Sequence, residues 1–418
     1  MSSSTTAAAA GATSTLQPGG SAKPTMYRIL LSISIVHLLN DSMQSVIPSI
    51  AGVLEESLKL SMSQIGWLLF AINFTSSVMQ PVVGMYTDRR PSPFMLPMGM
   101  AFSLIGMLTL AFAPSYMTVM IAVIFVGLGS AAFHPEGSRV SSMAAGSRRG
   151  LAQSIFQVGG NVGQSLAPLF AKFIFIPLGQ FGAVYFTAVA AAAIAVQMYV
   201  ASWYRGVLAS GGRTARKAVT RTIDPARKKQ LQFAIIVLIL LVFCRSWYNA
   251  MITGYYQFFL RDHYGVTLSD AQTYIFLFSI AGAVSTFFGG PLADRFGRKN
   301  VIWFSMIGSA PLAILLPYVS LTWAYVLLIV IGLILLSSFS VTVVYAQELF
   351  PGKVGTVSGL IVGLAFGLGG IGALAFGYLI ELYGLKSVMI ASSFLPILGI
   401  LTFLLPSDRT IREWTKDV

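Results

Sequence analysis

The stretch Gly289-Gly290-Pro291-Leu292-Ala293-Asp294-Arg295-Phe296-Gly297-Arg298-Lys299 lies between two long apolar runs. Its charged residues predict a short hinge between two membrane helices, because charged side chains are costly inside the hydrocarbon region. A degenerate copy, Gly84-Met85-Tyr86-Thr87-Asp88-Arg89-Arg90, also follows one apolar run and precedes another. The chain is therefore predicted to contain the same helical unit twice.

The composition indicates a membrane protein. Of the 418 residues, 56% are hydrophobic and only 10% are charged, whereas soluble proteins carry about 25% charged residues. The formal net charge of +13 would also suit a nucleic-acid-binding protein. The basic residues, however, lie in short loops between apolar runs, as membrane proteins place them. The single cysteine, Cys244, lies inside an apolar run and excludes an intrachain disulfide.

Twelve apolar runs approach the ~20 residues that a bilayer core of ~30 Å requires. They lie at residues 27–50, 65–85, 94–113, 116–143, 151–177, 181–203, 231–260, 271–293, 301–318, 323–349, 354–380 and 387–405. The sequence therefore predicts an all-α integral membrane protein with twelve transmembrane helices. Residues 1–25 are predicted to be a disordered tail rather than a signal peptide, because no charged segment precedes a long apolar one.

One long connection, residues 204–230, separates six predicted spans from six and is strongly basic. We interpret it as a solvated linker near anionic headgroups. It would join an N-terminal six-helix bundle at 26–203 to a C-terminal bundle at 231–406, which a tail at 407–418 follows.

The basic residues also predict the orientation. If the first span starts in the cytoplasm, every Lys and Arg lies on the cytoplasmic side except Lys59, Lys172, Arg245, Arg261 and Lys386. The positive-inside rule then places both termini in the cytoplasm.

The repeat extends into the spans. Gly159-Gly160-Asn161-Val162-Gly163 in the fifth span is echoed by Gly369-Gly370-Ile371-Gly372 in the eleventh, and Glu136 in the fourth span by Glu348 in the tenth. Two pseudo-symmetric six-helix bundles around a central cavity are therefore expected.

With twelve spans, this repeat and the hinge at 289–299, nearly the whole chain resembles the major facilitator superfamily. Four stretches are similar to one branch, the fosmidomycin-resistance efflux proteins of bacterial inner membranes: 36–45 (VHLLNDSMQS), 133–136 (FHPE), 150–161 (GLAQSIFQVGGN) and 344–349 (VYAQEL). The resemblance implies proton-driven drug export. It also implies that the hinge aspartates face helix N-termini of the opposite half and that the hinges gate the cytoplasmic side through Asp88, Arg89, Asp294, Arg295 and Arg298.

The first span carries His37, Asn40, Asp41 and Gln44 on one helical face, with mostly Leu, Ile and Val elsewhere. Such a face must turn toward water, a partner or the cavity. We expect Asp41 to carry the coupling proton and His37, Asn40 and Gln44 to contact substrate. The alternative is a polar cluster that only ties the first span to its neighbours.

Arg245 is the only basic residue at the middle of a predicted span, the seventh. By the repeat it lies near the level of Asp41, so the two side chains are expected to face each other across the cavity. A permanent buried ion pair is the alternative. Because a guanidinium binds a carboxylate or phosphonate through two hydrogen bonds, we expect Arg245 to bind an anion, with Tyr248, Asn249 and Tyr255 nearby.

Two other spans carry candidate residues. The fifth presents Gln153, Gln157, Asn161 and Gln164 on one face. Of these, Gln157 and Asn161 are predicted to contact substrate. The alternative is that the amides form hydrogen bonds between helices, where Gly159 and Gly163 would allow a neighbouring helix to approach closely. The fourth presents His134-Pro135-Glu136 and Arg139, where proline should interrupt the helix. His134 and Glu136 are candidates for a proton relay, or Arg139 forms a cytoplasmic gate with Glu136 or Glu348.

No metal-ligand spacing, cofactor motif or nucleophile motif is evident in the sequence, so no enzyme activity, cofactor or metal is expected. The main hypothesis is an inner-membrane antiporter that exchanges protons for a small anionic drug such as fosmidomycin, acting as a monomer. An uptake symporter for a small organic anion and a non-transporting sensor of the same fold are the alternatives. The expected partners are the drug, protons and the lipid bilayer, and not nucleic acid.

Overall fold

The computed structural model describes residues 24–146, 148–210, 225–350 and 354–416, and every regular element in this part of the chain is a helix. Most of the predicted N-terminal tail and residues 211–224 of the predicted linker lie outside the described residues. Nothing in the described part contradicts the all-α prediction.

The first part of the chain, here called the N half, contains the following elements: α1 (Tyr27–Ser49), α2 (Ala51–Leu58), α3 (Met62–Arg89), α4 (Met95–Ala111), α5 (Tyr116–Ala144), α6 (Arg149–Phe170), the π-helical turn η1 (Ala171–Phe175), α7 (Ile176–Leu178), the 3-10 turn η2 (Gly179–Gly182) and α8 (Ala183–Ala209).

The second part, the C half, contains α9 (Pro225–Ala250), the π-helical turn η3 (Met251–Tyr255), α10 (Tyr256–Tyr264), α11 (Leu268–Phe296), α12 (Arg298–Ile307), α13 (Ala310–Leu315), the 3-10 turn η4 (Leu316–Tyr318), α14 (Leu321–Leu335), the 3-10 turn η5 (Leu336–Ser338), α15 (Phe339–Leu349), α16 (Val354–Tyr383), α17 (Leu385–Ser392), the 3-10 segment η6 (Leu395–Leu404) and α18 (Asp408–Lys416).

Ten helical segments of the described chain are long and apolar enough to cross a membrane. One of them, residues 151–209, contains both the fifth and the sixth predicted spans, which turn at Gly179 with a positive φ of 60°. The third predicted span is the shorter apolar helix Met95–Ala111. The count of twelve crossings stays a prediction.

Three local expectations differ from the structure. Pro135 does not interrupt the fourth span, because α5 continues through it to Ala144. Helix α8 runs to Ala209 and α9 begins at Pro225, so both enter the predicted linker. The predicted C-terminal tail is largely the helix α18, whose residue Ile411 is buried against the C half.

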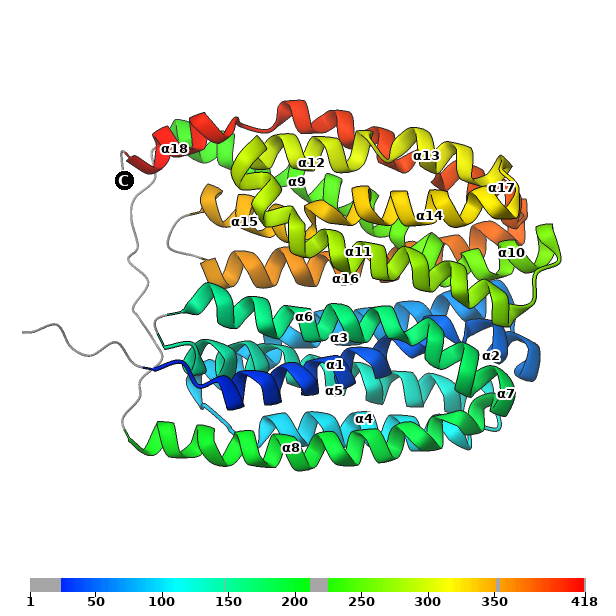
Figure 1. Cartoon of the computed structure of the whole chain (residues 1–418), viewed down its shortest axis with the longest axis horizontal. Coiled ribbons are helices and arrows are strands. Elements are labelled where there is room, and N and C mark those ends of the chain that lie inside the picture. The colour runs from blue at the N-terminus through cyan, green and yellow to red at the C-terminus, as the bar shows by residue number, and fades with distance from the viewer. Residues whose placement is uncertain (1–23, 147, 211–224, 351–353, 417–418) are drawn as a thin grey trace, which may run out of the picture.

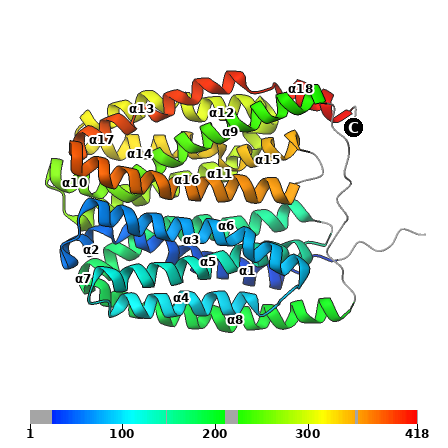
Figure 2. The ribbon, with the colours of Figure 1, turned by 180° about the vertical axis from the view of Figure 1, so that it is seen from behind.

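The helices of each half lie side by side and run along one common direction (Figure 1). The view from behind shows the same two groups (Figure 2). Both views place the start of α1, the end of α8, the start of α9 and α18 at one end of the molecule, here called the terminal end. The opposite end, which carries α2, α7 and α10, is the distal end.

The halves are joined at the distal end by polar contacts. Arg261 Nη1 lies 2.7 Å from Glu55 Oε2, and Gln257 Nε2 donates to the carbonyl of Pro48 at 2.9 Å. The backbone N–H of Ser63, at the start of α3, donates to Glu381 at 2.7 Å. Each of these bonds joins a residue of the N half to one of the C half.

The contact between α3 and α16 loosens toward the terminal end. A methyl group added at Gly377 would meet the backbone of Met62 and Ser63. One added at Gly370 would lie 2.9 Å from Asn73 Cβ, and one added at Gly363 would lie 3.7 Å from its nearest neighbour, the Ser77 carbonyl oxygen. The two helices therefore diverge along their length.

The buried apolar core follows the same pattern. One cluster of buried residues includes both halves, and its C-half members, such as Tyr248, Phe278 and Phe376, come from the middle and distal parts of the helices. A second cluster at the terminal end, with Leu231 and Tyr345 among its members, contains only C-half residues. The described ion pairs at the terminal end also stay within one half each.

Candidate functional site

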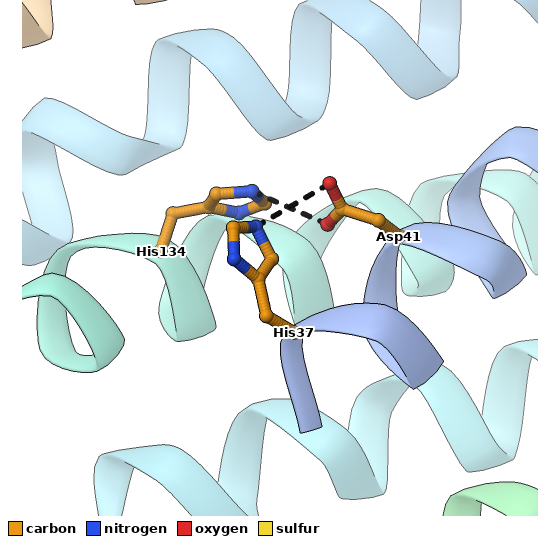
Figure 3. A group of neighbouring side chains, drawn as sticks. All are labelled: His37, Asp41 and His134. Atoms are coloured by element: carbon orange, nitrogen blue, oxygen red, sulfur yellow. Dashed lines mark ion pairs between the residues drawn. The ribbon is translucent and has the colours of Figure 1, made fainter. Parts of the chain in front are cut away.

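Asp41 of α1 is the centre of a buried polar cluster in the N half, and its carboxylate is 97% buried. Its Oδ1 accepts a hydrogen bond from Asn40 Nδ2 at 3.0 Å, and its Oδ2 accepts one from Gln164 Nε2 at 2.8 Å. Two histidines approach the same carboxylate: His37 Nε2 lies 3.4 Å from Oδ2 and His134 Nε2 lies 3.4 Å from Oδ1. Figure 3 shows both imidazole rings aimed at Asp41.

The opposite nitrogen of each histidine fixes the ring. His37 Nδ1 lies 2.8 Å from the carbonyl oxygen of Phe156, and His134 Nδ1 lies 2.8 Å from that of Ser130. A carbonyl oxygen only accepts hydrogen bonds, so both Nδ1 atoms carry a proton. Each Nε2 can therefore bond to Asp41 only when that histidine or the carboxyl group holds one more proton. The arrangement is suited to store a proton.

The cluster depends on a glycine of α6. A methyl group added at Gly160 would lie 2.6 Å from His37 Cε1 and 2.9 Å from Asp41 Oδ2, closer than real contacts allow. Gly159 and Gly163 face the backbone of Ser34 and Leu38 in the same way. A helix therefore packs closely against the glycines of the fifth span, as predicted, and this helix is α1.

The same three groups could in principle ligate a metal ion. The ligand atoms of His37, Asp41 and His134 all lie within 4.8 Å of one another. Spacing in the sequence does not reveal this, because His134 is far from the other two along the chain. Two imidazole nitrogens and a carboxylate suit a transition metal, and the carbonyl-bonded Nδ1 atoms would orient the rings for it.

The other predicted substrate residues of the N half differ in whether their side-chain amides are free to bind a ligand. Ser130 Oγ donates to Gln44 Oε1, and Gln44 Nε2 donates to Ser76 Oγ at 3.3 Å, so Gln44 belongs to the hydrogen-bond network of the N half. Gln157 and Asn161 are partly exposed, and neither side-chain amide has a hydrogen bond to a described residue. These two amides are the ones that remain open to a ligand.

Arg245 lies in the C half and is 4% exposed. Its Nη1 donates to Ser338 Oγ at 3.0 Å and to Thr342 Oγ1 at 3.1 Å, and its guanidinium carbon lies 5.3 Å from the centre of the Phe339 ring. Its Nη2 is buried and has no hydrogen-bond partner. No carboxylate of a described residue lies within 4.0 Å of the guanidinium.

No ion pair joins Asp41 to Arg245 among the described residues, so the permanent buried pair that was the alternative is absent. Their placement on opposite sides of one cavity stays a prediction. The hydroxyls of Ser338 and Thr342 were not predicted, although the four Ser and Thr residues among the six residues 337–342 were a usable signal. Near Arg245, the Tyr248 hydroxyl is buried without a partner, and the Tyr255 hydroxyl donates to the Ala373 carbonyl at 2.6 Å. Asn249 is partly exposed.

The predicted gating residues of the N half meet at Arg139. Its guanidinium lies 2.5 Å from Asp88 Oδ1 and 3.3 Å from Glu136 Oε1, and it donates to the Thr87 carbonyl at 2.9 Å. Glu136, one of the two partners predicted for Arg139, forms an ion pair with it. Arg89 is exposed.

The C half repeats this arrangement with Arg298, which lies 2.9 Å from Glu348 and 4.0 Å from Asp294. Arg295 lies against the Phe296 ring. The N-terminus of α12 holds no hinge aspartate of the other half. There, Asp408 of α18 accepts hydrogen bonds from the N–H groups of Arg298 and Lys299 at 3.2 and 3.4 Å. The expected contact between hinge aspartates and the opposite half is absent from the described residues.

The sequence model of the Major Facilitator Superfamily matches residues 33–373. The chain belongs to this superfamily. It is 55% identical over 390 residues to YfnC, an MFS-type transporter of Bacillus subtilis (strain 168), covering 93% of this chain and 95% of YfnC. It is 44% identical over 385 residues to the fosmidomycin resistance protein of Escherichia coli (strain K12), covering 92% and 94%. The protein is thus a membrane-spanning transporter of the Major Facilitator Superfamily.

Solved structures show the same fold. A bacterial homologue of the human lysosomal transporter Spinster matches with a TM-score of 0.74 and 18% identity, covering 94% of this chain and 98% of that one. The nucleoside transporter NupG matches with a TM-score of 0.68 and 14% identity, covering 90% and 98%. At these identities the Major Facilitator fold is shared, and the substrates of those proteins say nothing about this one.

Proposed function

We propose that the protein is a proton-coupled antiporter that exports a small anionic antibiotic of the fosmidomycin type from the bacterial cytoplasm. The evidence for a negatively charged substrate is Arg245. Its guanidinium is buried, its Nη2 has no hydrogen-bond partner, and no described carboxylate neutralises it. An unpaired buried cation is costly. A bound phosphonate or carboxylate would remove that cost through charge-assisted hydrogen bonds.

The relative that is named for fosmidomycin resistance supports the direction of transport, since a transporter confers resistance to a drug by lowering its concentration in the cell. Gln157 and Asn161, the open amides of α6, are proposed to bind the uncharged part of the substrate from the opposite half. His37, Asn40 and Gln44 are proposed to act on substrate only indirectly, because their polar groups are held in the network around Asp41.

Proton coupling is assigned to the cluster of Asp41, His37 and His134. Because both Nδ1 atoms donate to backbone carbonyls, an added proton on either Nε2 or on Asp41 would convert the 3.4 Å approaches into hydrogen bonds. His134 is the most exposed member, with 19% of its side chain accessible against 2% for His37 and 3% for Asp41. The proton is therefore proposed to leave and enter through His134, with Glu136 one step further toward the terminal end.

The transporter is proposed to lie in the inner membrane with its terminal end in the cytoplasm, because that end collects the basic loops. The distal end, where Arg261 and Glu55 join the halves, would then face outward. The diverging α3 and α16 and the separate core cluster at the terminal end favour a conformation open toward the cytoplasm. Bundles at 26–203 and 231–406 would supply both walls of one cavity within a monomer.

Drug resistance of cells tests this proposal. A drug-sensitive bacterial strain that expresses the chain should survive higher fosmidomycin concentrations than the empty strain, and resistance should fall in the order wild type, Arg245→Lys, Arg245→Met. Lysine keeps the charge without the two-pronged geometry, and methionine loses both. An uptake symporter would instead sensitise the cells. Full resistance with Arg245→Met would show that the anion site is wrong.

Proton coupling is tested separately in inverted membrane vesicles. Asp41→Asn should abolish drug accumulation driven by an imposed pH gradient while the protein remains in the membrane. Glu413→Gln, which removes an exposed carboxylate of α18 whose ion pair with Arg409 stays within that helix, is the matched control. If Asp41→Asn still concentrates drug in response to the gradient, the coupling site lies elsewhere.

A further inference from the structure

A small pocket opens on the outer edge of the C half, away from the cavity residues described above. It has a volume of about 220 Å³ and is lined by Lys299, Asn300, Trp303, Thr402 and Phe403. Both ribbon views show α12 and the segment that leads into α18 side by side at this edge (Figures 1 and 2). Lys299 is the last residue of the charged hinge, so the pocket lies near the terminal end, where the membrane surface is expected.

The polar groups of the pocket have spare donors. Thr402 is fully buried, and its hydroxyl has no hydrogen-bond partner; the indole N–H of Trp303 also has none. Lys299 Nζ donates to the carbonyls of Phe403 and Leu405 at 3.1 and 2.5 Å, which leaves its third N–H unused. Ammonium and indole groups only donate. An unsatisfied buried donor is costly, so an acceptor placed in the pocket would be stabilised by these groups.

No described residue supplies an acceptor to Trp303 or Thr402. Asp408 is the carboxylate beside Lys299, but its two oxygens accept from the backbone N–H groups of Arg298 and Lys299. Asn300 uses its amide N–H for the Phe296 carbonyl. A cation with two unpaired donors beside it matches a phosphate group, which offers negative charge and several acceptor oxygens.

The surroundings of the pocket indicate where the phosphate comes from. Phe403, which lines the pocket, is 64% exposed, and its neighbour Leu404 and Phe304, next to Trp303, are 52% and 54% exposed, so the surface around the pocket is apolar and suits contact with lipid. Lysine and tryptophan at this depth are typical of the headgroup region. We propose that the pocket binds the phosphate of an anionic phospholipid headgroup, with the acyl chains lying along the exposed apolar residues of α12 and η6.

Thermal unfolding of the purified protein in detergent, with lipid added, tests this site. Phosphatidylglycerol should stabilise the wild type more than phosphatidylcholine with the same acyl chains. Trp303→Phe keeps the ring and removes the N–H, and Thr402→Val keeps the shape and removes the hydroxyl. Each variant alone should weaken the phosphatidylglycerol effect, and both together should lower the apparent affinity at least tenfold, because two hydrogen bonds of about 1 kcal/mol or more each are lost.

The controls separate this site from general effects of aromatic residues and of phosphate. Trp323→Phe, at an exposed tryptophan of the opposite end, should leave the phosphatidylglycerol effect unchanged. Native mass spectrometry should show fewer bound phosphatidylglycerol molecules on the double variant than on the wild type. An unchanged phosphatidylglycerol affinity in the double variant would overturn the proposal, as would equal stabilisation of the wild type by millimolar inorganic phosphate.

Discussion

Removal of the Arg261 side chain should open the distal end of the interface between the halves. Arg261 Nη1 lies 2.7 Å from Glu55 Oε2, Nη2 lies 3.5 Å from Oε1, and Glu56 is 3.7 Å away. All of these partners belong to α2, in the other half, so Arg261→Ala removes the whole ionic link at this point. The link exists only while the distal end is closed.

The size of the effect follows from burial. The Arg261 and Glu55 side chains are 25% and 21% exposed. A hydrogen bond to a charged group contributes about 1.5–3 kcal/mol when buried, whereas an exposed ion pair contributes about 0–1 kcal/mol. For this intermediate case we expect about 1–2 kcal/mol, which corresponds to an increase of about 5–30-fold in the ratio of distally open to distally closed molecules.

Spin labels can measure this ratio. Lys59 and His263 are exposed at the distal end, one in each half, and Cys244 is fully buried. Labels at 59 and 263 should show a single short distance in the wild type and a growing long-distance population after Arg261→Ala, measured by pulsed electron paramagnetic resonance. Glu55→Gln should change the populations in the same direction by a smaller amount.

The matched control is Lys386→Ala, which removes an exposed cation of the same end that has no ion pair with a described residue. It should leave the distances unchanged. If Arg261→Ala gives the wild-type distance distribution, the pair does not hold the distal end closed and the reasoning fails.

Three further changes test other parts of the structure. Gly160→Ala should displace His37 and abolish export driven by a pH gradient in vesicles, at a cost in stability of about 1–3 kcal/mol; Gly206→Ala, where an added methyl meets nothing within 4 Å, should do neither. Asp408→Ala removes the acceptor at the α12 N-terminus and should lower the free energy of unfolding by about 0.5–2 kcal/mol in thermal or denaturant unfolding; an unchanged unfolding transition would contradict this role. Asp294→Asn, at a side chain that is 78% exposed, should impair drug efflux with little loss of stability; normal efflux would exclude a gating role.

The polar face of the first span shows what periodicity predicts well. His37, Asn40 and Asp41 are buried together, because a spacing of three and four residues places them on one side of a helix. The arrival of His134 at the same carboxylate could not be predicted, since it depends on how α5 packs against α1. The same limit applies to Glu348, which the repeat relates to Glu136 but which pairs with Arg298 of its own half.

Arg245 shows the limit of reasoning from an internal repeat. The repeat places a residue at a level along the helix, but the direction of its side chain depends on rotation about the helix axis and on the neighbouring helices. Here the neighbours are Ser338, in the 3-10 turn between α14 and α15, and Thr342 one turn later. The two hydroxyls bond the guanidinium Nη1 within the C half, and the repeat alone could not predict these neighbours.

This separation of charges bears on coupling. If Asp41 and Arg245 formed a pair, proton uptake by Asp41 would act on Arg245 directly, and the substrate anion would compete with Asp41 for the same guanidinium. In the structure the Asp41 carboxylate has two histidines and two amides as neighbours, whereas no described carboxylate forms an ion pair with Arg245. An anion at Arg245 would therefore gain its binding energy without first breaking an ion pair.

The proton and the substrate would then influence each other only through the relative position of the two halves, because each conformation sets the access of water to His134 and of drug to Arg245. Drug affinity can be measured with the distal end held closed by a cross-link between residues 59 and 263. Under this constraint, direct pairing predicts that Asp41→Asn changes the drug affinity at Arg245. Coupling through the halves predicts that the affinity stays the same.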